Sequence, residues 1–106
     1  MFMLPRLLKR ETRSAILNVS SIAAFTPGGM VPVYSATKAY NLALSIAMRD
    51  QFKDKLDILT VTPASVKTQM NSGRYCFSVT AEAHASTVIS QLGRTDKTYG
   101  HVYHAL

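Results

Sequence analysis

The spacing of apolar residues changes along the chain, and these changes predict alternating strands and helices. Residues 15–20 form a short apolar run that ends in serine, which is typical of a strand buried on both faces. Residues 58–62 form a second such run, and Pro63 ends it. Between the two runs, residues 33–52 have the spacing of a helix, with Pro32 near its start. The apolar positions of this helix are Ala36, Ala39, Tyr40, Ala43, Leu44 and Ala47.

The remaining segments continue the alternation. Residues 1–9 are mostly apolar and end in basic side chains, as the last turn of a helix does, but they show no N-terminal cap. Residues 68–79 predict an irregular loop. Thr80 is then expected to cap a helix over residues 81–92, which Gly93 follows.

The order strand, helix, strand predicts an α/β fold. The predicted helix is long enough to cross over a sheet, so the two strands should be parallel. Two strands and few helices leave much of such a sheet uncovered, and the helix at residues 1–9 lacks a cap. We therefore expect residues 1–106 to be a partial domain, the C-terminal part of a doubly wound parallel sheet.

Polar side chains gather where these elements meet. Ser20 and Ser21 close the first strand, Tyr34 opens the helix, and Pro63 closes the second strand. Ligands of open parallel sheets bind at the carboxyl ends of the strands. The sequence therefore predicts an active site at this edge.

Tyr34 and Lys38 lie one helical turn apart and should share a face. An ammonium beside a phenol favours the phenolate and would lower the tyrosine pKa, so that Tyr34 exchanges a proton with a carbonyl or alcohol oxygen near neutral pH. The Ser21 hydroxyl would orient the same oxygen. Such a set suits carbonyl–alcohol interconversion, for which a nicotinamide cofactor is the natural hydride source. The alternative is an exposed tyrosine and lysine on a helix, with serines that only end a strand.

Composition removes several other functions. The formal charge of +6 comes from scattered basic residues, and the cluster Arg6, Lys9, Arg10 and Arg13 has no interleaved aromatic residues, so a nucleic-acid surface is not expected. The single cysteine, Cys76, excludes an internal disulfide. No apolar run is long enough to span a bilayer. The three histidines have no carboxylate or cysteine placed beside them, so no metal site is expected.

The segments NVSS (18–21), YSATK (34–38) and TPASVKT (62–68) resemble the short-chain dehydrogenase/reductase family. This resemblance implies a Rossmann-type domain without its N-terminal cofactor-binding half, and a catalytic set of Ser21, Tyr34 and Lys38. Ser21 is preferred to Ser20 because the family's serine lies thirteen residues before its tyrosine. In the family the lysine also holds the nicotinamide ribose.

The resemblance also implies a cofactor-binding segment that begins at Pro63. Its expected contacts are Pro63, Ala64, Val66 and Thr68, together with Tyr34 and Lys38. Ala64 stands where the family has glycine, which narrows the backbone conformations available there. Met70, Tyr75 and Phe77 are the expected apolar substrate contacts beside Ser21, and packing within the loop is the alternative role for these three residues.

Within the family, MLPRLLKR (3–10) and YGHVYHAL (99–106) are most similar to the hydroxysteroid dehydrogenase and very-long-chain 3-oxoacyl-CoA reductase branch. That similarity implies NADP(H), a lipid-like carbonyl substrate and, for the full-length protein, the endoplasmic reticulum membrane. The second functional class left open is a non-catalytic remnant that associates through its helices, with a homo-oligomer formed through the helix at residues 33–52.

Overall fold

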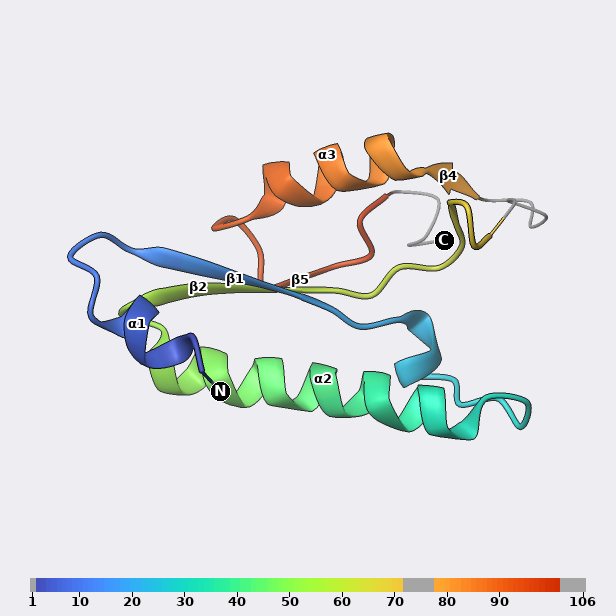
Figure 1. Ribbon diagram of the computed structural model, residues 1–106, viewed down its shortest axis with the longest axis horizontal. Coiled ribbons are helices and arrows are strands. Elements are labelled where there is room, and N and C mark those ends of the chain that lie inside the picture. Colours follow the sequence, from blue (N-terminus) through green and yellow to red (C-terminus); the bar gives the residue numbers. More distant parts are fainter. Residues whose placement is uncertain (1, 72–77, 102–106) are drawn as a thin grey trace.

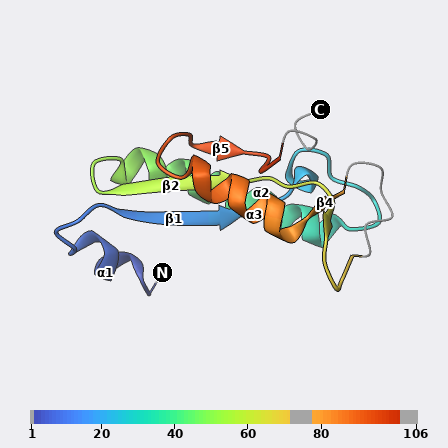
Figure 2. The same cartoon turned by 90° about the horizontal axis from the view of Figure 1, so that it is seen from above.

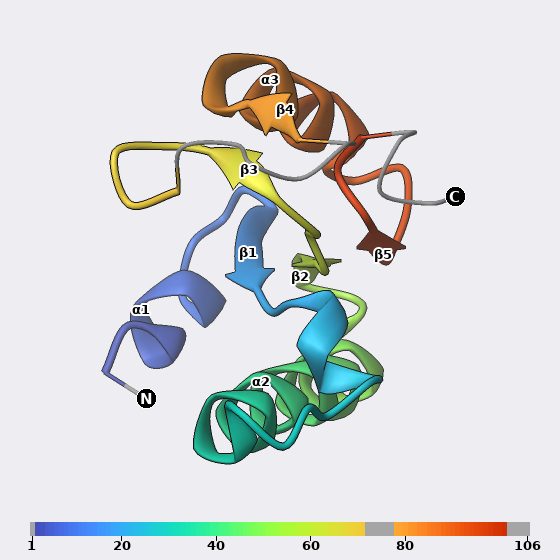
Figure 3. The same ribbon diagram turned by 90° about the vertical axis from the view of Figure 1, so that its right-hand side faces the viewer.

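A parallel sheet forms the middle layer of the protein, with helices on both of its faces (Figure 1; Figure 3). The structure is a computed structural model that describes residues 2–71 and 78–101. On one face lie α1 (Leu4–Leu8) and α2 (Pro32–Phe52), and on the other lies α3 (Ala81–Gln91). This arrangement confirms the α/β fold.

The sheet has the strand order β1-β2-β5 (Figure 2). Its strands are β1 (Ser14–Val19), β2 (Leu56–Val61) and β5 (Lys97–Thr98). The helix α2 connects β1 to β2, and these two strands pair in parallel over their whole length, from Ser14 opposite Leu56 to Val19 opposite Val61. The parallel crossover predicted from the sequence is therefore confirmed.

The predicted boundaries need small corrections. The strands expected at 15–20 and 58–62 begin one and two residues earlier and end one residue earlier. The helix expected at 33–52 starts at Pro32, and the one expected at 81–92 ends at Gln91. Thr80 caps α3 as predicted, because its hydroxyl accepts a hydrogen bond of 3.3 Å from the Ala83 amide.

Three short strands were not predicted. Two of them, β3 (Val66–Lys67) and β4 (Val79–Thr80), pair in parallel; β3 ends just before the loop expected at residues 68–79, and β4 begins at the last residue of that loop. The third, β5, pairs with β2 only through Thr60 and Val61. Two-residue strands give no hydrophobic periodicity, so nothing in the pattern marks them.

The expectation that the first strand is buried on both faces is wrong for β1. Its side chains alternate, and those that face α3 are open to solvent, with Leu17 38% and Val19 50% exposed. The other face is covered, because Ile16 packs against the cluster of Met48, Leu56 and Ile58. Within the described residues β1 is an edge strand, and α3 covers β2 rather than β1 through Leu59, Val61 and Val88.

The helix α2 turns small polar residues toward the sheet. Ser35, Ser45 and Met48 are its buried residues, and the Asn18 amide of β1 donates a hydrogen bond of 2.7 Å to the Ser45 hydroxyl. Most of the apolar positions found from helical spacing face away instead: Ala36, Tyr40, Ala43 and Ala47 are exposed. We call these four residues the alanine face of α2.

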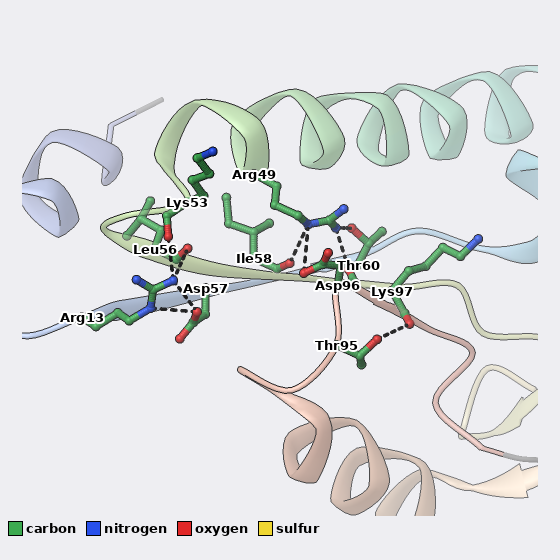
Figure 4. A network of polar contacts seen from close by, with 10 residues as sticks. All are labelled: Arg13, Arg49, Lys53, Leu56, Asp57, Ile58, Thr60, Thr95, Asp96 and Lys97. Carbon is green, nitrogen blue, oxygen red and sulfur yellow. Dashed lines mark hydrogen bonds and ion pairs between the residues drawn. The ribbon is translucent and has the colours of Figure 1, made fainter.

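Arginines fasten the strands at two places along the sheet, Arg13 at the start of β2 and Arg49 farther along it (Figure 4). Arg13 donates hydrogen bonds of 2.8 Å to the Asp57 carboxylate and 2.7 Å to the Lys53 carbonyl. The hydrogen bond that Arg13 donates to Asp57, together with the charges of Asp57 and Asp54, raises the pKa of Arg13 above its ordinary value. Arg49 of α2 reaches β2 and the start of β5, with a hydrogen bond of 2.6 Å to the Asp96 carbonyl.

Candidate active site

The carboxyl ends of β1 and β2 and the first turn of α2 meet at one end of the molecule (Figure 1). Ser20, directly after β1, is fully enclosed at 1% exposure. Its amide donates to the Val61 carbonyl at 2.7 Å and its hydroxyl donates to the Lys38 carbonyl at 2.7 Å. Ser20 therefore joins the strand to the helix, and this hydroxyl is not directed at a substrate.

Ser21 has a different environment. It caps the short 3-10 helix η1 (Ile22–Ala24), and its hydroxyl oxygen accepts a hydrogen bond of 3.2 Å from the Ala23 amide. Among the residues that the structure describes, no acceptor takes the hydroxyl hydrogen, so it remains available to a ligand. The Ile22 amide also donates to the Pro63 carbonyl at 3.2 Å, which holds η1 beside the chain that leaves β2.

Tyr34 and Lys38 share one face of α2, as their spacing predicts. Tyr34 lies in the first turn and is 46% exposed, so its ring is accessible at the site. The Lys38 ammonium lies 5.6 Å from the centroid of this ring, within the range of a cation–π contact. It also donates a hydrogen bond of 3.1 Å to the Val19 carbonyl, the last of β1. Lys38 thus brings a positive charge to the point where strand and tyrosine meet.

The segment that begins at Pro63 leaves β2 beside these residues. Pro63, Ala64 and Val66 are half-buried, and Thr68 is exposed. Thr68 and Asn71 exchange backbone hydrogen bonds of 2.9 and 3.2 Å, which closes a tight turn. The structure thus brings Pro63 close to Ser21, through the Ile22 amide, while Thr68 lies in a separate turn.

The predicted substrate contacts are only partly described. Met70 is 97% exposed. Tyr75 and Phe77 lie outside the described residues, as does Cys76. The structure therefore brings Ser21, Tyr34, Lys38 and Pro63 to one end of the sheet, and the substrate contacts stay a prediction.

An apolar groove that sequence reasoning missed runs from this edge along the face of the sheet under α3. Its volume is about 360 Å³, and its walls include Leu17, Val19, Val61, Pro63, Val66 and Val88. One wall of the groove could have been predicted from the sequence, because His84 and Val88 lie one helical turn apart on α3 and therefore share a face. The groove joins the Pro63 segment to a surface that accepts an apolar group.

The hydrogen-bond donors of Lys38 fit the ribose of a nicotinamide cofactor. An ammonium has three N–H donors, and Val19 takes one from Lys38, which leaves two for neighbouring hydroxyls. Pro63 and Val66 provide an apolar wall nearby. In residues 2–71 and 78–101, no group of three histidine, cysteine or acidic side chains is arranged to hold a metal ion. No helix in these same ranges has the length and hydropathy of a membrane span.

Comparison with known proteins identifies the class. Residues 2–75 match the family model of the short chain dehydrogenases, and the chain belongs to this family of oxidoreductases. It is 33% identical over 110 residues to hydroxysteroid dehydrogenase-like protein 1 of Gallus gallus, covering 97% of this chain and 33% of that protein. It is 31% identical over 106 residues to the very-long-chain 3-oxoacyl-CoA reductase of Rattus norvegicus, and this match covers 97% of this chain and 34% of that protein.

A bacterial relative matches a shorter part of the chain. The uncharacterized oxidoreductase DltE of Bacillus subtilis is 37% identical over 68 residues, which are 63% of this chain and 27% of that protein. No solved structure matches. The chain spans about a third of the length of the first two relatives and about a quarter of the bacterial one.

Proposed function

We propose that this chain provides the proton-transfer residues of an NADP(H)-dependent reductase that converts a lipid-like carbonyl compound, of the 3-oxoacyl-CoA or ketosteroid type, to an alcohol. The observation that carries the proposal is the position of the Lys38 ammonium, 3.1 Å from the Val19 carbonyl and 5.6 Å from the Tyr34 ring centroid. Family membership and the very-long-chain reductase relatives support the reaction class.

Ser21, Tyr34 and Lys38 have distinct tasks in the proposed reaction. When bound, the nicotinamide supplies a hydride to the carbonyl carbon. Tyr34 donates its phenolic proton to the carbonyl oxygen, so that the product is a neutral alcohol. The Ser21 hydroxyl donates a hydrogen bond to the same oxygen and orients it. Lys38 stabilises the phenolate that remains on Tyr34 and holds the ribose with its two remaining N–H donors.

The cofactor and the substrate are proposed on separate grounds. NADP(H) rests on the sequence resemblance, as does the endoplasmic reticulum membrane for the full-length protein. A lipid-like substrate is supported by the apolar groove of about 360 Å³ that begins at Pro63 and Val66. Pro63, Ala64, Val66 and Thr68 remain the proposed cofactor-binding segment.

The test uses a fusion, because the chain spans about a third of its relatives. The 106 residues replace the corresponding third of the rat reductase, and NADPH oxidation is followed with a 3-oxoacyl-CoA. Tyr34→Phe should lower the rate by about 10²–10⁴-fold, the usual contribution of a general acid. Tyr40→Phe is the matched control, because Tyr40 is 66% exposed on the same helix. Equal rates for the two variants would reject Tyr34 as the acid.

A second function is favoured by the alanine face of α2. Ala36, Tyr40, Ala43 and Ala47 form an exposed stripe without charge, the surface expected of a helix that associates with a second helix. We propose that this face supports a homo-oligomer. In sedimentation velocity, Ala43→Glu should return an associated chain to a monomer, and Ala83→Glu on α3 should leave it associated. If Ala43→Glu leaves the sedimentation coefficient unchanged, α2 is not the interface.

A further inference from the structure

A second cavity lies on the opposite face of the sheet from the groove and outside the candidate active site. Its volume is about 340 Å³, within the range of small-molecule sites. The walls are Phe25, Leu42, Ile46, Arg49, Thr60 and Lys97, which come from the end of η1, from α2, and from β2 and β5. No motif in the sequence assigns a role to this place.

Two cationic side chains line the cavity. The Lys97 ammonium lies 5.1 Å from the Phe25 ring centroid and 5.9 Å from that of Tyr99. Across the part of the chain that the structure describes, no carboxylate forms an ion pair with Lys97. Its charge is therefore balanced only by the faces of aromatic rings and by solvent.

Arg49 is held by hydrogen bonds within the protein, but some of its N–H donors are unused. Its Nη2 donates to the Asp96 carbonyl at 2.6 Å and to the Thr60 hydroxyl at 3.4 Å, and its Nε lies 3.5 Å from the Asp96 carboxylate. Within residues 2–71 and 78–101, Nη1 meets no acceptor, and in Figure 4 it points away from the bonded side of the guanidinium. Asp96, 74% exposed on its side chain, is the one acidic group paired here. One positive charge therefore remains in excess at the cavity.

Apart from Thr60, the rest of the wall is apolar. Phe25 and Ile46 are 46% and 47% exposed although both are large apolar side chains, and Leu42 is the third apolar residue of the wall. A site that is lined by both cationic and apolar side chains complements an anion that carries a hydrocarbon tail. We propose that this cavity binds an aliphatic monocarboxylate, with its carboxylate between Lys97 and Nη1 of Arg49 and its tail against Phe25, Leu42 and Ile46.

Binding of octanoate to the isotopically labelled chain, followed by amide chemical shifts, tests the proposal. Octanol is the matched neutral probe, because it has the same tail and no charge. Octanoate should shift the amides of Leu42, Ile46 and Lys97 in a saturable way, and octanol should bind there at least about tenfold more weakly, since charge-assisted hydrogen bonds are lost.

Two lysine variants distinguish binding at the cavity from a general attraction of the anion to a basic protein. Lys97→Met should weaken octanoate binding by about tenfold or more, whereas Lys55→Met, which removes an exposed lysine away from the cavity, should leave it unchanged. The spectra report the fold of each variant directly. The proposal is overturned if octanoate shifts mainly Leu17, Val61 and Ile89 of the groove under α3, if octanol binds equally well, or if both lysine variants bind octanoate alike.

Discussion

The hydroxyl of Ser20, the residue directly after β1, donates a hydrogen bond of 2.7 Å to the backbone carbonyl of Lys38. The Lys38 ammonium returns a hydrogen bond of 3.1 Å to the carbonyl of Val19, the residue before Ser20. Strand and helix are therefore joined twice at this position. Because Lys38 is held at both its backbone and its side-chain end, its charge has a defined place beside Tyr34.

Replacement of Ser20 tests this junction. Ser20→Ala should lower the free energy of unfolding of the chain by about 1 kcal/mol, the usual net value of one buried hydrogen bond. The measurement is a urea titration followed by circular dichroism. Ser86→Ala is the control, because Ser86 is exposed on α3, and it should change stability by no more than about 0.5 kcal/mol. Equal midpoints for the two variants would show that the junction contributes nothing.

Lys38 should affect the cofactor affinity of the fused enzyme. Lys38→Met removes an ammonium that keeps two N–H donors beside its bond to Val19, so NADPH should bind more weakly in a fluorescence titration. Lys38→Arg should restore part of the affinity, because a planar guanidinium keeps the charge but misplaces it. Unchanged NADPH affinity in Lys38→Met would make the YSATK segment a chance pattern.

Gly100 is required by its conformation and by its neighbour. Its φ is +84°, and a Cβ there would overlap the imidazole ring of His84. Gly100→Ala should therefore destabilise the chain by at least about 2 kcal/mol, or lower Tm by about 8 °C. Gly28→Ala is the matched control, because no described heavy atom lies within 4 Å of a Cβ at Gly28. A similar Tm for both variants would contradict this packing.

Arg49 should hold β5 against β2. The amides of Thr60 and Thr62 donate to the carbonyls of Asp96 and Thr98 at 2.9 and 2.8 Å, and Arg49 fixes the first of these carbonyls. Arg49→Met should raise hydrogen exchange at both amides by at least about tenfold.

Arg13→Met is the control for Arg49→Met. It removes an ion pair whose side chains are 48% and 33% exposed, at the other end of β2. Exposed ion pairs contribute about 0–1 kcal/mol, so exchange at Thr60 and Thr62 should change by about twofold at most. If the two arginine variants give the same exchange rates, Arg49 does not hold β5.

The features that could be predicted are those that repeat or that use particular side chains. Hydrophobic runs identified β1 and β2, and helical spacing identified α2, because each spans five residues or more. Thr80 was identified as a cap because few residue types have a short hydroxyl that accepts from the first turn. Spacing alone brought Tyr34 and Lys38 to one face, and the structure adds their contact.

What could not be predicted depends on neighbours distant in sequence. Helical spacing predicted that the residues of the alanine face share one side of α2, but not that this side faces away from the sheet. The sheet packs against Ser35, Ser45 and Met48 instead. The hydrogen bond from Asn18 to Ser45 satisfies polar groups between α2 and the sheet, and no hydrophobic periodicity reveals such a pair. The exposure of Leu17 and Val19 likewise depends on which elements cover the sheet, and the strand pattern does not contain that information.

The exposed segment from Phe25 to Val33 lies between the two halves of the candidate site. Ser21 is held by η1 and through the Ile22–Pro63 hydrogen bond, while Tyr34 and Lys38 are held by α2 and by β1. Residues 26–31 act as a tether between the two anchors, with room at Gly28 and Gly29, where an added Cβ would meet no described heavy atom within 4 Å. A few inserted residues at Gly28 should therefore lengthen the tether without separating the serine from the tyrosine, so sequences of unequal spacing can share one geometry.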